Sequence, residues 1–163
     1  MSNFTFRPVE TKVSEYIIWY FQEHGEPLTN LKLQKLLYYA QGWHLALYDK
    51  PLFDSPIEAW VHGPVAPDFY HEYKKYKHQP ITKQQTKPDL DKIISEHLEE
   101  VINEYGSYSA FQLENLTHHS DPWKNARGNT PIDAPSRAKI SIEDMKIWFK
   151  KKMEENEKEK NQR

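Results

Sequence analysis

One short segment of the chain holds the densest group of side chains that could bind a metal ion. His118, His119 and Asp121 stand within four residues of one another, and imidazole and carboxylate groups are common ligands of divalent cations. Adjacent histidines on a helix point about 100° apart, however, and so rarely share one ion. We favour the simpler interpretation that Asp121 caps the following helix and that one histidine bonds to the backbone. The metal site stays open as an alternative.

A second candidate for chemistry is the histidine of His62-Gly63-Pro64-Val65, which directly follows a predicted strand. A histidine at a strand end could act as a general acid or base near neutral pH. The spacing identifies no partner nucleophile or carboxylate for it. The Gly-Pro pair indicates a tight turn into the next helix, and we favour this structural interpretation.

A third candidate is a group of lysines that could bind nucleic acid, with Tyr73 and Tyr76 nearby to stack on bases. Between residues 66 and 88 the chain carries five lysines against two carboxylates, Asp68 and Glu72. That balance favours a solvated surface over a phosphate-binding stripe. The lysines are Lys74, Lys75, Lys77, Lys83 and Lys87.

Several common kinds of catalytic or ligand site are excluded by residue types and spacing. The chain has no cysteine, so it has no disulfide, thiolate metal site or cysteine nucleophile. No two of its five glycines are closer than 17 residues, which excludes the P-loop and the dinucleotide fingerprint. The His-Glu-x-x-His, Gly-x-Ser-x-Gly and EF-hand patterns are absent. The net charge of −2 argues against a protein that mainly grips phosphate backbones.

The elements that must position these residues are mostly helices. Apolar residues recur at helical spacing and stop at capping or breaking residues, which predicts a single compact domain of six or seven helices. Two separate apolar stripes on the second helix predict that it lies at the centre of the fold, packed on both faces. One stripe consists of Leu33, Leu36, Leu37, Ala40 and Leu47, and the other of Leu31, Tyr38 and Leu45. In the last helix, Ile142, Met145 and Phe149 are expected to face inward. The predicted helices cover 13–24, 29–48, 67–76, 90–105, 109–117, 121–127 and a segment that opens at Ser141.

One small β element interrupts the helices. Alternating residues from Ile57 to Val61 predict a short strand, and Leu52-Phe53 is its expected partner in a hairpin. No apolar residue follows Met153, so we expect a domain over 1–153 and a charged, disordered tail over 154–163.

The sequence shows no targeting pattern. Its first residues lack a basic segment followed by an apolar run, and its longest apolar and aromatic run, from Tyr16 to Phe21, is far shorter than the roughly 20 residues of a membrane span. We therefore expect a cytoplasmic protein that binds no membrane.

Three blocks of sequence, in order, resemble a known family. The first is LTNLKLQKLLYYAQGWHL from Leu28 to Leu45, and the second combines PLF (51–53), IEAW (57–60) and HGPV (62–65). The third combines LENLTH (113–118) with DPW (121–123). In these blocks the chain closely resembles the Panacea domain, a family also described as SocA-like or as phage-associated and GepA-like. The resemblance extends from about Thr11 to Phe149.

This resemblance implies a binding protein and no enzyme. Panacea domains serve as antitoxins in two-gene operons of bacteria and phages, where they neutralise varied protein toxins by direct contact. The resemblance implies a cognate toxin encoded by a neighbouring gene and no cofactor, and it leaves homo-oligomers, operon repression and delivery of the toxin to a protease open. The alternatives are a nucleic-acid-associated regulator and a metal-assisted hydrolase of unrecognised type.

The resemblance also guides the choice of partner-binding residues. Gly42, Gly63 and Pro64 resemble architectural positions, namely a close helix approach and a turn. Gln41, His62 and His118 are polar groups on hydrophobic segments, and we favour internal hydrogen bonds for them over a surface groove. The predicted partner-binding residues are Trp43, Trp60, His62, His118 and Trp123.

Overall fold

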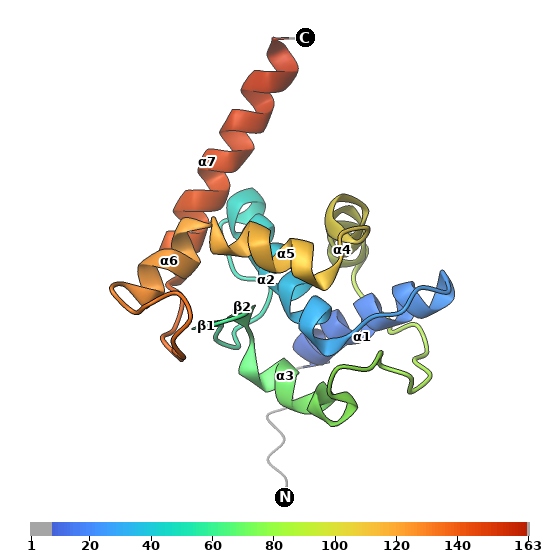
Figure 1. Ribbon diagram of the computed structural model, residues 1–163. Coiled ribbons are helices and arrows are strands. Elements are labelled where there is room, and N and C mark those ends of the chain that lie inside the picture. The colour runs from blue at the N-terminus through green and yellow to red at the C-terminus, as the bar shows by residue number, and fades with distance from the viewer. Residues whose placement is uncertain (1–7, 163) are drawn as a thin grey trace, which may run out of the picture.

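The computed structural model describes residues 8–162, and most of their regular structure is helical (Figure 1). The α-helices are α1 (Pro8–Glu23), α2 (Asn30–Tyr48), α3 (Pro67–Tyr73), α4 (Lys92–Tyr105), α5 (Ala110–His118), α6 (Asp121–Arg127) and α7 (Ile142–Asn161). A short 3-10 helix, η1 (Lys74–Tyr76), extends α3, and the strands are β1 (Glu58–Trp60) and β2 (Gly63–Val65). The mainly helical fold with one small hairpin is therefore confirmed.

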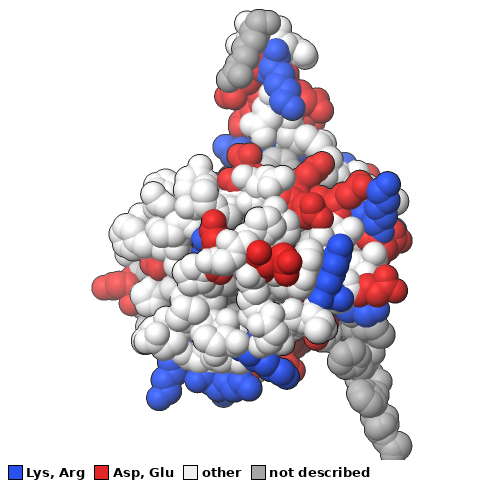
Figure 2. Space-filling model, turned by 90° about the vertical axis from the view of Figure 1, so that its right-hand side faces the viewer, with Lys and Arg blue, Asp and Glu red and all other residues white. Residues whose placement is uncertain are grey.

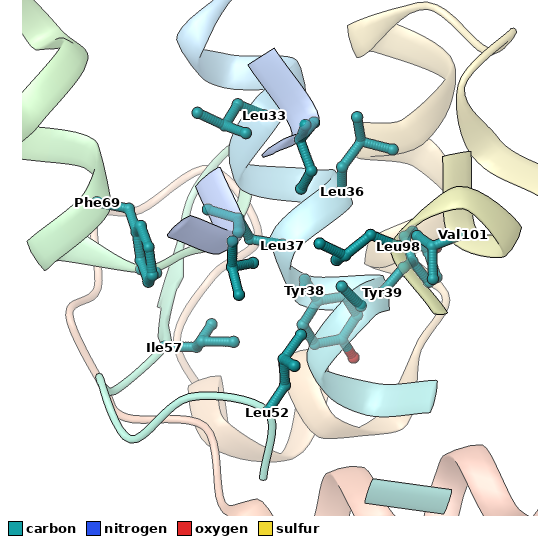
Figure 3. Close-up of a cluster of buried hydrophobic side chains, with 14 of the residues drawn as sticks. Leu33, Leu36, Leu37, Tyr38, Tyr39, Leu52, Ile57, Phe69, Leu98 and Val101 are labelled. Carbon is teal, nitrogen blue, oxygen red and sulfur yellow. The ribbon is translucent and has the colours of Figure 1, made fainter. Parts of the chain in front are cut away.

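Helix α2 forms the centre of the fold, as its two apolar stripes predicted. Thr29 caps its first turn by accepting a hydrogen bond from the Lys32 amide at 3.2 Å. Fourteen of its nineteen residues are buried, because α1, α3, α4, α5 and α7 all pack around it. Figure 3 shows Leu98 of α4 directed toward α2 on one side, while Leu37 lies on the side of Phe69 of α3.

The buried polar side chains of α2 hold the backbone of the segment from 53 to 70. Each one bonds to a main-chain group that would otherwise be buried without a partner. Their order along the helix runs opposite to that of the segment, which therefore returns along α2. The bonds join Asn30 to Tyr70 O at 3.1 Å, Gln34 to Ala66 N at 3.0 Å, Lys35 to Pro64 O at 3.2 Å and Gln41 to Phe53 O at 2.7 Å.

The hairpin differs from its prediction in its second strand. β1 pairs in antiparallel fashion with β2, so that Ala59 lies opposite Pro64. The expected partner, Leu52-Phe53, is bound elsewhere: both of its amides donate to Gln41 Oε1, at 2.7 and 3.3 Å. The Gly-Pro pair accordingly lies in a strand that follows a turn at 61–62, rather than in a turn leading to a helix.

The C-terminal segment corrects the prediction of a disordered tail. α7 continues to Asn161 and extends away from the rest of the molecule (Figure 1). The segment beyond Met153 lacks apolar residues, but it also lacks glycine and proline, and its Glu and Lys residues are good helix formers. Lys152 and Glu155 add an ion pair of 3.3 Å along it. The polar residues after Met153 therefore do not pack against the domain, but they still form a helix.

Two predicted core positions are exposed. Met145 and Phe149 are fully buried as expected, whereas Ile142 is 44% and Leu47 is 48% exposed. Both of these residues lie in a terminal turn of their helix, and a helical face is buried only over the length that a neighbour covers.

No helix within residues 8–162 is both long enough and apolar enough to cross a membrane.

Candidate functional site

Four of the five predicted partner-binding residues gather around the hairpin. Trp60 ends β1 and His62 occupies the turn, while His118 ends α5 and Trp123 lies in α6. β2 packs against α5 and β1 packs against α6, so residues far apart in sequence meet here. The fifth residue, Trp43, lies elsewhere on α2.

His118 and Trp123 form a stacked pair beneath the hairpin. Their rings lie 4.2 Å apart at an angle of 17°, and the Trp123 indole N–H donates to the Trp60 carbonyl oxygen at 2.8 Å. Burial lowers the pKa of His118, an effect that the Glu114 carboxylate partly offsets. His118 Nε2 is buried and has no hydrogen-bond partner among the residues that the structure describes. The pair therefore fixes the hairpin on α5 and α6 with a neutral imidazole.

His62 has a different environment, because its side chain is 68% exposed. Its Nδ1 lies 3.2 Å from Glu114 Oε2, and the Glu114 side chain is only 18% exposed. His62 is therefore oriented by a carboxylate and presented to solvent at the tip of the hairpin. A neutral imidazole that donates its Nδ1–H to this carboxylate can accept a hydrogen bond from an incoming partner at Nε2.

A buried lysine amine lies under the same turn. Lys35 is fully buried, and its ammonium donates to the Pro64 carbonyl oxygen at 3.2 Å. Burial lowers its pKa to about 7, although the Glu114 carboxylate acts in the opposite direction. The sequence analysis did not identify Lys35. Its position on a helix predicted to be packed on both faces was the available signal.

Gly63 permits this packing. Its φ of +106° is one that L side chains rarely adopt, and a Cβ there would lie 2.7 Å from Lys35 Cε and 2.8 Å from Thr117 Oγ1. The architectural role that the resemblance implied for Gly63 has this physical basis: it brings β2 against α2 and α5.

Arg127 holds the other side of the hairpin and was also missed. It is buried, and its guanidinium donates to the carbonyl oxygens of Ala59, Pro131 and Ala134, at 3.0, 2.7 and 2.5 Å. It also lies 4.8 Å from the Trp123 ring centroid. An arginine in the last turn of a short helix gives no sequence signal of such a role.

Trp60 carries the site to the surface. Its ring is half-buried, with Tyr70 at 5.1 Å on one side and the Arg137 guanidinium at 5.7 Å on another. It borders a shallow cavity of about 300 Å³ that also includes His71 and Pro135. We call the surface formed by Trp60, Val61, His62, Glu114 and Arg137 the hairpin face.

The three polar residues expected to bond internally behave differently from one another. Gln41 does so fully, through Leu52 and Phe53. His62 points to solvent and pairs with Glu114, whereas His118 bonds to the Val61 backbone, as expected, and also stacks on Trp123. They do not bond to one another.

The predicted metal ligands do not converge. His119 Nδ1 bonds to the Asn115 carbonyl oxygen at 2.8 Å, which is the expected backbone bond. The cap of α6 is Ser120 rather than Asp121, which occupies the first helical position. Within residues 8–162, no three His, Asp or Glu side chains come together as metal ligands.

The lysines after α3 do not form a continuous basic surface. Figure 2 shows Lys and Arg side chains along the lower edge of the molecule. The adjoining cavity of about 630 Å³, between α1 and α3, is lined by Glu15, Asp68 and Glu72 as well as by Lys75 and Lys83. The mixture of charges matches the solvated surface that the sequence favoured.

Trp43 lies in a separate groove. Its indole N–H donates to the Tyr105 hydroxyl at 2.8 Å, and its ring meets the edge of Phe149 with centroids 5.2 Å apart. The groove, of about 480 Å³, lies between α2, α4 and α7. The predicted residues therefore belong to two distinct surfaces.

Comparison with known families now adds to this geometry. Residues 33–124 match the family described as antitoxin SocA-like, Panacea domain. The chain belongs to this family. The matched part of the Panacea domain begins in α2 and ends in α6. It contains the whole hairpin face except Arg137, and of the groups beneath the face it contains Lys35, His118 and Trp123 but not Arg127.

One characterised relative is antitoxin SocA of Caulobacter vibrioides (strain NA1000 / CB15N). It is 36% identical to this chain over an alignment that covers 60% of the chain and 58% of the relative. The Panacea chain thus matches less than two thirds of the relative's length. No solved structure matches the chain.

Proposed function

We propose that this protein is an antitoxin that neutralises a cognate protein toxin, encoded by a neighbouring gene, by binding it directly through the hairpin face. The observation that carries the proposal is the convergence of Trp60, His62, His118 and Trp123 on one hairpin, within the residues matched by the antitoxin family. These residues divide into two roles. The half-buried His118 and the buried Trp123 support the hairpin from beneath, while Trp60 and His62 reach the surface.

The chemistry of the hairpin face suits protein recognition. Half-buried tryptophans are frequent anchors of protein interfaces, because they bury a large area at low entropic cost. His62, which Glu114 orients, adds a hydrogen-bond acceptor at Nε2, and Arg137 adds a cation beside the Trp60 ring. The underlying scaffold is rigid, since Lys35, Arg127 and Gln34 all bind main-chain groups of the hairpin or its flanks. Such preorganisation lowers the cost of binding.

Binding, rather than catalysis, is the function that this geometry supports. The His62 imidazole is held by the Glu114 carboxylate, and the His118 imidazole is stacked on Trp123 beneath the hairpin. The imidazole and carboxylate groups of 118–121 point to different partners. Within residues 8–162 the metal-assisted alternative therefore has no donor set, and the lysines that the nucleic-acid alternative would use stand among carboxylates.

The test is copurification of the product of the neighbouring gene with tagged protein. We expect wild-type protein to retain the toxin, and the double variant Trp60→Ala, His62→Ala to bind it at least about tenfold more weakly, as loss of an interface anchor implies. A matched control is Tyr76→Ala, His78→Ala, which removes a half-buried aromatic residue and an exposed histidine on and just after η1. Circular dichroism checks that both variants fold. Equal binding by the two double variants would reject the hairpin face, and no binding by wild-type protein would reject the function.

A further inference from the structure

The groove that contains Trp43 is the second concave surface with a defined chemical character. Its floor comes from α2 and α4, and the C-terminal half of α7 forms one wall. α7 lies outside the residues matched by the family. Asn156, Glu159 and Lys160 are the residues of α7 that line the groove.

The floor of the groove is apolar and partly uncovered. Leu47 is 48% exposed, and the half-buried rings of Trp43 and Tyr105 lie beside it, joined by their hydrogen bond. Val101 completes the floor and is itself buried. A large aliphatic side chain and two aromatic rings open to solvent in one groove mark a surface that a partner can cover.

The rim of the groove is acidic. Glu100, Glu104 and Glu159 stand around it against a single lysine, Lys160. Among residues 8–162, no Lys or Arg forms an ion pair with any of these three glutamates. Glu100 and Glu104 are four residues apart on α4, so their like charges repel each other. Figure 2 shows acidic side chains gathered close to the base of the protruding helix.

The walls determine what shape of partner fits. The floor and the wall are formed by three helices, α2, α4 and α7. The backbone groups of a helix are already bonded within it, so an extended peptide finds no strand edge to pair with. A helix satisfies its own backbone and presents side chains alone. The stretch of α4 from His97 to Tyr105 that lines the groove is about 12 Å long, at about 1.5 Å per residue, which matches roughly two turns of a docked helix.

We infer that this groove binds a positively charged amphipathic helix of a partner protein. Apolar residues of that helix, spaced i, i+3 or i+4, and i+7, cover Trp43, Leu47 and Tyr105, while its lysines or arginines face Glu100, Glu104 and Glu159. The charges that repel one another in the free protein then become paired. This site is separate from the hairpin face and does not require that the helix belong to the toxin.

The experiment uses two synthetic peptides and the full-length protein. One is an amphipathic helix of four turns with leucines at the stated spacing and lysines elsewhere, and the other has glutamate at each lysine position. Fluorescence anisotropy measures their binding. We expect the lysine peptide to bind with saturation and ever more weakly as salt is added, and the glutamate peptide not to bind.

Variants assign that binding to the groove. The double variant Glu100→Gln, Glu104→Gln is expected to weaken it about tenfold, as the loss of two exposed charge pairs implies. Leu47→Ser should weaken it as well. The control Glu23→Gln, Glu26→Gln removes two exposed carboxylates from the end of α1 and the loop after it, and should leave binding unchanged.

Three outcomes overturn the inference. If the groove and control variants lose the same amount of affinity for the lysine peptide, net charge alone attracts the peptide. If the lysine and glutamate peptides bind equally well, the acidic rim has no role. Dissociation of a wild-type dimer by the groove variant, seen in sedimentation, means that a second copy of this chain occupies the groove. The assay contains no toxin, so its failure leaves the antitoxin proposal intact.

Discussion

At the scale of single residues, Lys35 holds the hairpin through a buried amine, and burial destabilises the charged form of that amine. A lysine is seldom fully buried, because its cation loses hydration that one carbonyl oxygen cannot replace. Among the described residues the amine bonds to Pro64 O alone, and its pKa falls to about 7 from 10.5. Between these two values the unfolded chain binds a proton that the folded protein does not, so stability rises with pH.

Lys35→Met tests this buried charge. In wild-type protein the free energy of unfolding should rise by about 1 kcal/mol per pH unit between pH 7.5 and 9.5, and the variant should lose most of that slope. Urea denaturation at three pH values in this range measures it. The exposed control Lys124→Met should keep the wild-type slope. Identical slopes for wild-type protein and Lys35→Met would mean that the amine is hydrated or paired in solution.

The residues that were predicted and those that were missed differ in one physical respect. Trp60, His62, His118 and Trp123 were identified by type, and the fold brings them together. Lys35, Glu114 and Arg127 were missed because lysine, glutamate and arginine usually lie on the surface. Their roles depend on which main-chain group lies next to them, and tertiary structure alone determines that.

At the scale of elements, the junction of α2 and α7 depends on one close approach. A Cβ on Gly42 would lie 2.1 Å from Phe149 Cε2, so the Phe149 ring occupies the space that any other residue would need. That ring also packs against Tyr38 and Tyr39 of α2. The close helix approach expected at Gly42 is thus confirmed.

Gly42→Ala should therefore destabilise the protein by about 3 kcal/mol, since the core must shift to accept the methyl group. Phe149→Ala should cost about 3–5 kcal/mol through the cavity that it leaves. The double variant should lose less unfolding free energy than the two single variants lose together, because removing the Phe149 ring makes room for the methyl group at position 42. Chemical denaturation of all four proteins provides the double-mutant cycle. Simple additivity would contradict the contact.

Helices were predicted better than the strand pairing and the tail. The capping box of Ser109 and Gln112 and the stop at Gly128 are local signals, and the structure contains both. The strand that pairs with β1 could not be identified from local sequence. The predicted partner, Leu52-Phe53, is bound by Gln41, and the observed partner is β2, which follows the turn. The lack of apolar residues after Met153 predicts that the tail does not pack against the domain, but it does not predict whether the tail forms a helix.

Removal of residues 154–163 separates the domain proposed over 1–153 from its helical extension. We expect a change in unfolding free energy below about 0.5 kcal/mol, since Met145 and Phe149 remain and the lost turns are mostly exposed. Binding of the lysine peptide should weaken, because the truncated protein lacks Asn156, Glu159 and Lys160. A large loss of stability would show that the tail belongs to the domain.

At the scale of the whole molecule, buried histidines set its tolerance of acid. Burial lowers the pKa values of His44, His97 and His118 below the ordinary 6.5. His44 and His97 each bond to a backbone carbonyl, at 2.7 and 2.9 Å. As the pH falls below 6.5 the unfolded chain takes up protons that the folded protein resists, so stability decreases.

We expect the unfolding free energy to fall by about 1–3 kcal/mol between pH 6.5 and 5. Thermal melts at pH 7, 6 and 5 measure the effect as a decrease in Tm. His97→Gln should reduce the pH dependence, whereas His78→Gln, at an exposed position after η1, should not. A Tm that stays constant over this range would contradict the neutral burial of these imidazoles.

The central claim is that this Panacea domain silences a toxin by contact through the hairpin face. The most direct measurement is growth of bacteria that express the neighbouring gene alone, with wild-type protein, or with the Trp60→Ala, His62→Ala variant. The account predicts arrest with the gene alone, recovery with wild-type protein and arrest again with the variant. A harmless neighbour, or one that still arrests growth beside wild-type protein, would contradict it.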